Sequence, residues 1–538
     1  TITTNIFGVK YMLDFCVEHR AERFAFASSN EVYGENRGDV EKFDENYCGY
    51  IDSNSADGLR ASFYKEFNYL YIFNLRGNQR TQGEQSRKEG GKIFGSGSRA
   101  PIAISILVKD GSDAHELYYH DIGDYLSRKE KLKILGNAIS VDGLNWQRII
   151  PDNNYDWINQ RDLEYAKYTP LVSNISTDIG AFNFSSIGIQ SARDTWVVNF
   201  GRKKLKENVQ RLIKHYNAER LAIQNNAEHI LNNDNHYIKW TRKLKRYASD
   251  NKNIDYDPSE ITEYMYRPFT KKYNYLDNDL IEYPGKYLSK WGQKNMVLVT
   301  TGRGASRKFS CYISSIPVDY HCLDTGQNFY RYDNESGETD LISLTDNVTF
   351  GFSKKTGLSS DDAFAYIYGL ISSPEYQNRY VNDLNKDLAR IPVVAEKEKY
   401  VEVGKKLMDL HINYEEVPVY EGVTIDASEN PSYKVEKMKF AKKRNPETQK
   451  LENDRSIIIF NSDITIKNIP EKAYEYVVNG RSAIEWIIDQ YQVKTDKKSG
   501  ITDDPNDFSS DPKYIFNLLL RIINVSVQTV DLVNSLPK

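Results

Sequence analysis

Basic and glycine residues crowd one stretch of the chain, FNLRGNQRTQGEQSRKEGGKIFGSGSRAP, which lies between two apolar runs. Guanidinium and ammonium groups can hold phosphates, and glycines let the backbone come close to such a ligand. The stretch therefore predicts a phosphate-contacting loop over 74–100, and the alternative is a flexible solvated loop. The candidate contacts are Arg76, Arg80, Arg87, Lys88, Lys92 and Arg99, with Gly90, Gly91, Gly95 and Gly97 as the permissive positions.

Three further segments place basic residues among aromatic residues or glycines. KWTRKLKR carries Trp240 among five cations, four of which follow it, YRPF carries Arg267 before a proline, and TGRGASR is a glycine turn. An arginine can contact a phosphate or bind guanine O6 and N7 with two hydrogen bonds, and the sequence does not separate these roles. Each cation could instead be a solvated surface charge or one member of an intramolecular ion pair. The tyrosines around Arg267 could bury the aliphatic part of its side chain. These candidates are Arg242, Lys243, Lys245, Arg246, Arg267, Arg303 and Arg307.

The cysteines and histidines predict no metal centre. Cys16, Cys48, Cys311 and Cys322 are scattered over the chain without the paired CxxC spacing of a zinc site. His321 beside Cys322 comes nearest to a cluster, and ordinary packing explains it. So few cysteines also exclude a disulfide framework and favour a reducing compartment, so we expect a cytoplasmic protein.

The elements that must position these residues alternate between helices and strands early in the chain. This alternation indicates an α/β sheet, and residues 137–195 are predicted to be rich in loops. The spacing predicts a helix over 5–20, a strand at RFAFASS, a helix from about Asp57, buried strands at Tyr69–Phe73 and Ile102–Val108, and a strand followed by a charged helix in YYHDIGDYLSRKEKLKIL.

The remainder predicts a mixed α+β region. Residues 201–232 have helical periodicity, with a Lys/Arg face that we interpret as solvated surface, and 295–316 predict a strand, a glycine turn and a strand. DDAFAYIYGLISS predicts a helix capped by Asp361 or Asp362, and EYQNRYVNDLNKDLAR predicts a second helix after Pro374. Residues 424–455 are predicted to be a polar linker, and YIFNLLLRIINVSVQTVDLVNSL an amphipathic helix that packs on the body.

Length and composition describe an ordinary globular chain. Its 538 residues are 40% hydrophobic and 27% charged, with a net charge of −4, so several domains are expected. Nucleic-acid binding stays compatible with this charge, because it needs a local basic face rather than a basic total. No apolar run approaches the ~18–20 residues of a membrane span. The start, TITTNIFGVKYML, has neither a signal peptide nor an initiator Met, which indicates a fragment or an open-ended reading frame.

Residues 1–50 resemble the extended short-chain dehydrogenase/reductases, which are NAD-dependent sugar-nucleotide epimerases and dehydratases. Asn5 matches the asparagine of that family's helix, and FASSNEVYG matches its strand and turn. The resemblance implies a substrate contact for Ser29 and the position of a dehydratase acid for Glu31. The glycine-rich turn for NAD and the proton-transferring YxxxK are missing, so an inactive fragment is expected. It should dock poorly, because half a Rossmann unit cannot bury both faces of its strand.

Residues 51–538 resemble the C-terminal part of Type ISP and related single-chain restriction–modification enzymes. In that family an adenine-specific N6 methyltransferase is followed by a target-recognition domain. The matching stretches lie in the family's order, and they are IDSNSADGLR, FNLRGNQRTQGEQSRKEGGKIFGSGSRAPIAISILVK, HDIGDYLSRKEKL, DWINQRD, MYRPFTKKYNYLD, TTGRGASRKFS, AFAYIYGLISSPEYQNRYVNDL and AYEYVVNGRSAIEWIIDQYQVKTDKKSGITDDPND.

This resemblance implies a fold of the α/β plus α+β class. The C-terminal part of a Rossmann-like methyltransferase sheet would occupy 51–184, and a mixed target-recognition domain 185–538, behind the short α/β fragment over 1–50. It implies double-stranded DNA as the partner, with the 74–100 loop on the side that faces DNA. S-adenosylmethionine is implied for the full-length family, and NAD for the family that the N-terminal fragment resembles.

The residues that would do the chemistry are missing. Adenine N6 methyltransferases hold the flipped base with an Asn/Asp-Pro-Pro-Tyr/Phe turn, and no two prolines are adjacent in this chain. FGSGS (Phe94–Ser98) looks like the FxGxG loop for S-adenosylmethionine, but it precedes a strand instead of following one. There is also no GxxxxGK[ST] phosphate loop. We therefore predict no catalytic residue and no bound cofactor, and no methylation, cleavage or ATP hydrolysis without an upstream half.

Three functions are open at this stage. The first is the DNA-binding specificity portion of a Type ISP-like enzyme, fused to a broken dehydrogenase piece. The second is a sugar-nucleotide epimerase or dehydratase remnant with an unrelated extension, which a bound nucleotide would favour. The third is a nonfunctional chimeric product, joined at Tyr50–Ser55 where the two families share a similar phrase.

Overall fold

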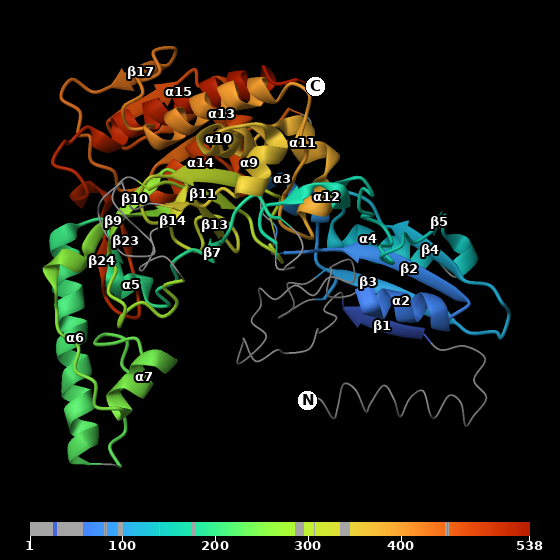
Figure 1. Cartoon of the computed structure of the whole chain (residues 1–538), viewed down its shortest axis with the longest axis horizontal. Coiled ribbons are helices and arrows are strands. Elements are labelled where there is room, and N and C mark those ends of the chain that lie inside the picture. Colours follow the sequence, from blue (N-terminus) through green and yellow to red (C-terminus); the bar gives the residue numbers. More distant parts are fainter. Residues whose placement is uncertain are drawn as a thin grey trace. The chain divides into compact units, whose positions relative to one another are not determined.

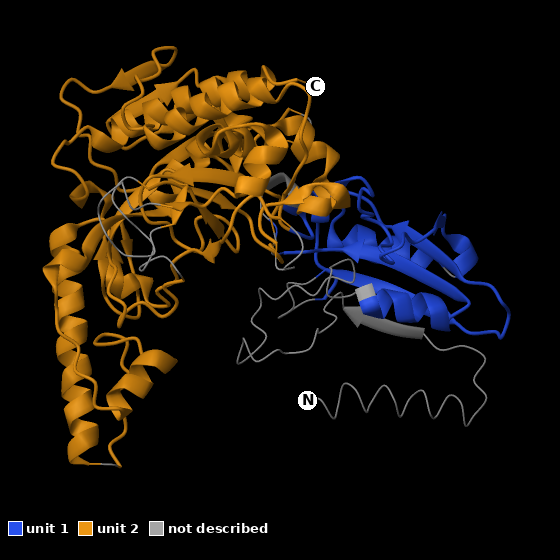
Figure 2. Ribbon diagram, in the orientation of Figure 1, with its two compact units in different colours: residues 1–165, 385–387 blue, residues 166–384, 388–538 orange. Residues whose placement is uncertain are grey.

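A computed structural model provides the structure of the chain. It describes residues 57–79, 81, 83–94, 101–138, 140–173, 179–226, 228–285, 295–305, 307–333, 345–446, 449 and 451–537, together with the backbone of 25–29. The chain forms two compact units (Figure 2). Unit 1 comprises residues 1–165 and 385–387, and unit 2 comprises residues 166–384 and 388–538. The division follows Tyr165, ahead of the boundary between 184 and 185 that the sequence predicts.

The sheet of unit 1 has five strands in the order β1-β3-β2-β4-β5. β2 and β4 run parallel, β3 runs antiparallel between β1 and β2, and β5 runs antiparallel to β4. The predicted strands at RFAFASS, Tyr69–Phe73 and Ile102–Val108 are confirmed. The strands are β1 (Ala25–Ser29), β2 (Tyr69–Arg76), β3 (Ile102–Val108), β4 (Glu116–Asp121) and β5 (Gln147–Ile149).

The backbone of β1 pairs with β3 along its whole length, from Ala25 opposite Ile106 to Ser29 opposite Ile102. The expectation that residues 1–50 dock poorly is therefore wrong for this strand, because the free edge of β3 supplies partners for its backbone groups. The predicted helix over 5–20 lies outside the described residues, and so does Glu31.

Both faces of the unit 1 sheet are covered by helices (Figure 1). Successive side chains of a strand point to opposite faces, so Leu70 and Ile72 pack on one side and Phe73 and Leu75 on the other. Phe63, from helix α2 (Asp57–Glu66), lies against the first pair. Helix α4 (Arg128–Asn137) contributes apolar side chains to the second. Unit 1 is thus an α/β layered structure, as predicted.

The stretch over 74–100 is not a continuous loop. Helix α3 (Gly83–Glu89) occupies its middle, with the sequence GEQSRKE. The prediction of a loop was wrong here because a helix of two turns built from Glu, Gln, Lys and Arg needs no apolar stripe, and these residues are good helix formers.

A buried carboxylate joins distant parts of unit 1. Asp156 is fully buried and faces three cations. Its oxygens lie 2.7 Å from Arg60, 2.7 Å from Arg161 and 3.0 Å from Lys386. The ammonium of Lys386 also donates to the carbonyl of Asn159 at 2.6 Å. These contacts explain why residues 385–387 belong to unit 1 although they lie far along the chain.

Unit 2 contains several small sheets rather than one large one. The larger sheets have the strand orders β8-β10-β9, β12-β11-β13-β7 and β17-β20-β19-β18. The smaller ones pair β14 with β15, β16 with β6, β21 with β22 and β23 with β24. The strands are β6 (Thr169–Pro170), β7 (Ser186–Ile187), β8 (Val198–Asn199), β9 (Ile261–Arg267), β10 (Thr270–Tyr275), β11 (Val297–Thr300), β12 (Cys311–Ser314), β13 (Gln327–Tyr330), β14 (Tyr332–Asp333), β15 (Thr345–Asp346), β16 (Arg390–Ile391), β17 (Thr424–Ala427), β18 (Lys439–Arg444), β19 (Leu451–Ile459), β20 (Ile464–Lys467), β21 (Val477–Val478), β22 (Arg481–Ser482), β23 (Lys494–Thr495) and β24 (Thr502–Asp503).

The helices of unit 2 pack on these sheets (Figure 1). One extended hydrophobic core among the described residues includes side chains of α6, α14 and α15. α10, α13 and α15 form its most closely packed group of helices, and α6 carries α7 along its side. The helices are α5 (Asp194–Val197), α6 (Arg202–Asn225), α7 (Arg242–Ser249), α9 (Phe350–Thr356), α10 (Ser360–Ile371), α11 (Pro374–Arg379), α12 (Val381–Leu384), α13 (Lys397–Ile412), α14 (Ala483–Gln490) and α15 (Tyr514–Asn534).

Two glycines let α10 and α13 approach closely. A Cβ added to Gly369 would lie 2.3 Å from the carbonyl oxygen of Tyr400, and one added to Gly404 would lie 2.0 Å from that of Ala365. Both distances are far below contact distance, so the two backbones meet where neither helix carries a side chain.

Two details of the predicted helices need correction. α10 is capped by Ser359, whose hydroxyl accepts from the backbone N of Asp362 at 3.1 Å, and not by Asp361 or Asp362. The two aspartates lie in the first turn, where the helix dipole favours carboxylates. The helix after Pro374 is divided in two at Tyr380, and α6 ends at Asn225 rather than near 232.

Residues 424–455 were predicted to be a linker, and this is wrong. They contribute β17, β18 and the start of β19 to a four-stranded sheet. The sheet is anchored by buried Phe440 and Ile458, which face each other across β18 and β19. The other side chains of these strands are mostly exposed and polar, so the segment lacks the regular apolar alternation that reveals a strand.

α15 is long and apolar enough to cross a membrane by length and composition, contrary to the expectation that no segment approaches a span. In the structure 61% of its most apolar window is buried, and it packs against α13 and α14. This confirms the prediction of a C-terminal amphipathic helix that packs on the body.

Candidate nucleic-acid interface

α7 concentrates basic side chains on a short helix. Four of its eight residues are Lys or Arg and none is acidic. Arg242, Lys245 and Arg246 are exposed, whereas Lys243 is half-buried. Burial lowers the pKa of Lys243, whose ammonium donates to the carbonyl oxygens of Asn278 and, at 2.8 Å, Ile281. Three of the four predicted cations therefore face solvent, and the fourth holds the helix in place.

The start of α7 is fixed by a buried arginine. Arg193 is fully buried, and burial lowers its pKa to about 10, an effect that Glu282 partly opposes. Its guanidinium donates to the carbonyl oxygen of Leu280 and to the hydroxyl of Thr241, and it lies 3.5 Å from the carboxylate of Glu282. Thr241 caps α7, and Glu282 accepts from the backbone N of Lys243 at 3.2 Å. This buried network orients α7 and its exposed cations.

α6 carries a second row of cations. Its buried residues, including Leu205, Leu212 and Tyr216, lie on one side of the helix. The opposite side exposes Lys203, Lys206, Arg211 and Lys214, and the one acid there, Glu207, lies 3.6 Å from Lys204. The sequence had suggested a merely solvated face for α6. Its packing beside α7 could not be predicted from spacing.

Arg267 serves the interior of unit 2. Its guanidinium lies 2.9 Å from the carboxylate of Asp319 and 3.9 Å from the centre of the Tyr266 ring. Burial lowers the pKa of Arg267, but Asp319 and the neighbouring tyrosines outweigh it, so the pKa is raised overall. The alternative drawn from the sequence, that the tyrosine-rich surroundings bury this side chain, is the one that the structure supports.

The glycine turn between β11 and β12 separates its two arginines. Arg303 is exposed, and Lys308 beyond it is exposed as well. Arg307 is half-buried, donates to the carbonyl oxygen of Asn479 at 2.8 Å and lies 5.9 Å from the Trp486 ring centre. Burial lowers its pKa. Arg303 thus stays a candidate contact, whereas Arg307 ties the turn to the segment before β22.

The candidate residues of unit 1 also include some that are exposed and some that are engaged within the fold. Arg76 lies at the end of β2 and pairs with Asp121 at 2.7 Å and with Asp124. Arg87 is exposed on α3, while Lys88 and Lys92 are half-buried. Arg80 and Arg99 lie outside the described residues, as do Gly95 and Gly97. Ser29 is described only by its backbone in β1.

Gly90 and Gly91 have a packing role. A Cβ on Gly90 would lie 2.2 Å from the carbonyl oxygen of Leu126, and one on Gly91 would lie 2.3 Å from the backbone N of Arg128. Gly90 also has a φ of +67°, which favours glycine. The close approach that these glycines permit is thus to the chain's own 126–128 segment, and the prediction that they serve a phosphate is not needed to explain them.

Among the candidates that the structure describes, Arg87, Arg242, Lys245, Arg246 and Arg303 are exposed. Arg76, Lys243, Arg267 and Arg307 make intramolecular contacts that account for their burial. The largest group of exposed cations belongs to α6 and α7 in unit 2.

No group of three or more potential metal ligands occurs in the part of the chain that the structure describes. Cys311 and Cys322 are buried and unbridged, and burial raises the pKa of the Cys311 thiol to about 12. His321 is exposed, and its ring lies 4.9 Å from the ring of Tyr320.

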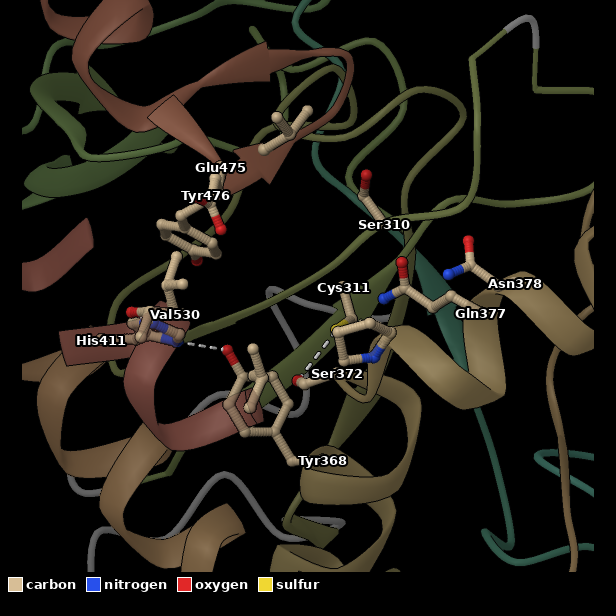
Figure 3. Close-up of a pocket in the computed structure, with 14 residues that line it drawn as sticks. Ser310, Cys311, Tyr368, Ser372, Gln377, Asn378, His411, Glu475, Tyr476 and Val530 are labelled. Carbon is tan, nitrogen blue, oxygen red and sulfur yellow. Dashed lines mark hydrogen bonds between the residues drawn. The ribbon is translucent and has the colours of Figure 1, made fainter. Parts of the chain in front are cut away.

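A cavity of about 220 Å³ lies in unit 2 among α10, α11, α13, β12 and α15 (Figure 3). His411 lies at its base, where the close-up shows its ring bonded to the hydroxyl of Tyr368. Burial lowers the pKa of His411 to about 3, so its ring is neutral. The hydroxyl of Thr529 donates to the carbonyl of Val525, and therefore accepts from Nε2 of His411 at 2.8 Å.

This arrangement fixes the tautomer of the histidine. Nε2 carries the proton, so Nδ1 accepts from the hydroxyl of Tyr368 at 2.7 Å. The ring also stacks on Tyr476 at 5.2 Å. A neutral histidine with both nitrogens bonded holds three helices together, and it is poorly suited to acid–base chemistry at neutral pH.

One protein family matches more than half of the chain. Residues 180–518 match the protein family described as the Type ISP C-terminal specificity domain. A search of curated proteins found no match. The family and the three structures described here give no support for an epimerase or dehydratase, so the resemblance of residues 1–50 stays a prediction.

Three solved structures resemble most of the chain. A nuclease-deletion mutant of the Type ISP restriction–modification enzyme LlaGI, in complex with a DNA substrate mimic, matches 91% of the chain with a TM-score of 0.79 and 49% identity. The ATP-dependent Type ISP enzyme LlaBIII, bound to DNA, matches 91% with a TM-score of 0.77 and 37% identity. The DrdV–DNA complex matches 90% with a TM-score of 0.75 and 25% identity. The chain spans 38%, 32% and 49% of these three chains, respectively.

Proposed function

The chain belongs to the family of the Type ISP C-terminal specificity domain, and we propose that unit 2 binds double-stranded DNA as the target-recognition part of a restriction–modification enzyme. The observation that carries this proposal is the basic character of α7, on which Arg242, Lys245 and Arg246 are exposed and no residue is acidic. The LlaGI, LlaBIII and DrdV structures were all determined with DNA or a DNA mimic, which supports it.

We further propose that unit 1 is the C-terminal part of an adenine-specific methyltransferase domain. Unit 2 holds fewer than three quarters of the residues, so a match to LlaGI over 91% of the chain extends into unit 1. The mixed sheet with helices on both faces is compatible with the end of a Rossmann-like sheet, in which β3 is the reversed strand.

The described residues do not supply a site for S-adenosylmethionine. The one segment that resembles its binding loop, FGSGS, precedes β3, whereas such a loop follows a strand and opens a helix. The chain also lacks adjacent prolines and a GxxxxGK[ST] segment. We therefore expect this chain by itself to bind DNA without methylating it, cleaving it or hydrolysing ATP.

The test is the salt dependence of duplex binding by the full chain. Phosphate contacts release counterions, so log K should fall linearly with log salt concentration, with a slope of about −0.9 per contact. Replacing Arg242, Lys245 and Arg246 by Gln together should make the slope shallower by about 2 to 3 units. A matched control removes three exposed lysines elsewhere in unit 2, at Lys354, Lys405 and Lys406.

The control variant should keep the wild-type slope within about one contact. Binding that does not weaken between low and high salt would contradict the proposal for the whole chain. Equal losses in the α7 variant and the control would show that binding depends on net charge and not on α7.

A further inference from the structure

Asparagines are concentrated where α6 ends and the chain turns back toward α7. Five of the eleven residues over 225–235 are Asn. We call residues 228–241 the interhelix loop. Within it Asn233 and Asn235 are exposed, and among the described residues their side chains have no hydrogen-bond partner. Each therefore presents an amide N–H donor and a carbonyl acceptor to solvent.

The interhelix loop is held in one shape by contacts that leave these two amides unused. The indole N–H of Trp240 donates to the carbonyl oxygen of Asn232 at 2.8 Å, and the backbone N of Asn232 donates to Glu219 on α6 at 2.9 Å. Tyr237 stacks on His215 of α6 at 5.1 Å, and the side chain of Ile238 is buried in the core. A loop fixed to a helix in this way loses little conformational entropy on binding.

A turn around Asp234 sets the direction of the two asparagines. The carboxylate of Asp234 accepts from the backbone N of His236 at 2.9 Å and lies 3.0 Å from its ring nitrogen. The backbone N–H groups of Tyr237 and Ile238 donate to the carbonyl of Asp234. The acid between the asparagines is thus engaged within the turn, while its two neighbours stay exposed.

Cations flank the interhelix loop. α7, with its three exposed cations, follows it directly in the chain. The turn between β23 and β24 also lies close to it, since a Cβ built on Gly500 would be 3.9 Å from Cδ2 of His236. That turn exposes Lys497 and Lys498. Two sets of exposed cations therefore adjoin a segment that carries unpaired amides.

We propose that Asn233 and Asn235 read base edges and that the base they select is adenine. The inference rests on the proposed function, since it requires that the exposed cations of α7 lie on DNA. An Asn amide can accept from the N6 amino group of adenine while donating to N7, a pairing that the major groove offers for no other base. Phosphate contacts from α7 and the Lys497–Lys498 turn position the loop, and the amides supply sequence preference.

The test selects duplexes from a random pool with the full wild-type chain, with Asn233→Ala and Asn235→Ala singly, and with Asn430→Ala as the control. Asn430 is also exposed without a hydrogen-bond partner among the described residues, and it follows β17, far along the chain from this loop. Because neither loop side chain makes an intramolecular bond, the variants should melt at the wild-type temperature. Binding to a duplex of fixed unrelated sequence is measured in parallel.

We expect the wild-type chain to enrich a motif that contains adenine, and each loop variant to lose discrimination at one adenine by about 5- to 100-fold. Affinity for the unrelated duplex should stay unchanged, as should the motif of the Asn430→Ala control. If the loop variants enrich the wild-type motif, the inference is overturned and the proposed function stands. If the wild-type chain binds duplexes without any motif, the inference is overturned and only the DNA-binding part of the proposed function stands. If the wild-type chain binds no duplex, both fail.

Discussion

Replacing Arg193 by Met should loosen the attachment of α7 and lower the free energy of unfolding of unit 2 by about 3–5 kcal/mol. The guanidinium of Arg193 is fully buried and bonds to Leu280, Thr241 and Glu282. Met fills much of the same space but leaves the carboxylate of Glu282, whose side chain is 8% exposed, without its buried cation.

The magnitude follows from what remains after the substitution. Removing one member of a buried ion pair strands the other charge, which costs more than the pair itself contributes. Glu282→Gln strands the guanidinium instead and should cost a similar amount. In Arg193→Met combined with Glu282→Gln neither charge remains, so the double variant should be more stable than the sum of the two losses indicates, by at least about 1 kcal/mol.

Urea unfolding, followed by tryptophan fluorescence, measures these free energies. Arg379→Met is the control, because Arg379 is exposed on α11 and should cost less than about 1 kcal/mol. Duplex binding gives a second measurement. Arg193→Met should weaken binding while leaving the salt slope unchanged, because the cations of α7 are all still present.

Two results would refute this reasoning. Additive losses in the double variant would show that Arg193 and Glu282 are not coupled. A shallower salt slope in Arg193→Met would show that Arg193 is itself a phosphate contact and not a residue that positions α7.

Three other predictions follow from buried groups and close packing. Burial lowers the pKa of folded His411 to about 3. The unfolded chain, with a histidine pKa of about 6.5, therefore binds an extra proton between these values, and stability falls as pH drops through that window by up to about 1.4 kcal/mol per pH unit. Urea unfolding from pH 7 to pH 4 should show this loss reduced in His411→Gln, and equal pH slopes in both proteins would contradict it. Gly404→Ala should destabilise the α10–α13 contact by about 1–3 kcal/mol. Gly136→Ala is the control and should be neutral, because a Cβ at this position meets no atom within 4 Å. Thermal unfolding compares the two variants, and a wild-type melting temperature for Gly404→Ala would refute the packing argument. Asp156→Asn should leave the buried cations of unit 1 uncompensated and lower its stability by about 3–5 kcal/mol, and unchanged hydrogen-exchange protection over 57–165 would disprove it.

Apolar periodicity made unit 1 and the long helices predictable. β2 and β3 are short apolar runs bounded by turns, and α15 is an amphipathic segment at the end of the chain. Apolar periodicity did not reveal the strands and helices that bury few side chains. β18 and β19 bury few side chains, so their sequence resembles a linker, and α3, with the sequence GEQSRKE, has no apolar residue that could form a stripe. In these segments the partners across the sheet or along the chain determine the structure, and local sequence does not reveal them.

The candidate interface could be predicted only as a set of cations. Lys243 and Lys245 are two residues apart on the same helix, yet one bonds to carbonyls of 278–281 and the other is exposed. Arg267 and Asp319 form their pair across a separation of 52 residues. Which cation is used internally depends on such distant partners, so the type and spacing of the residues could not separate contacts with DNA from contacts within the fold.

The path of residues 385–387 constrains how this protein could exchange specificity with its relatives. A recombination event near Tyr165 would replace all of unit 2, and it would also import the segment that carries Lys386. The incoming segment must then still place a cation against Asp156 and a donor against the carbonyl of Asn159 in the resident unit 1. A stable hybrid should therefore either receive a cation at position 386 or arise from two crossovers that keep the original residues 385–387. Exchange of unit 2 should then be most frequent between relatives that share the buried pair of residues 156 and 386.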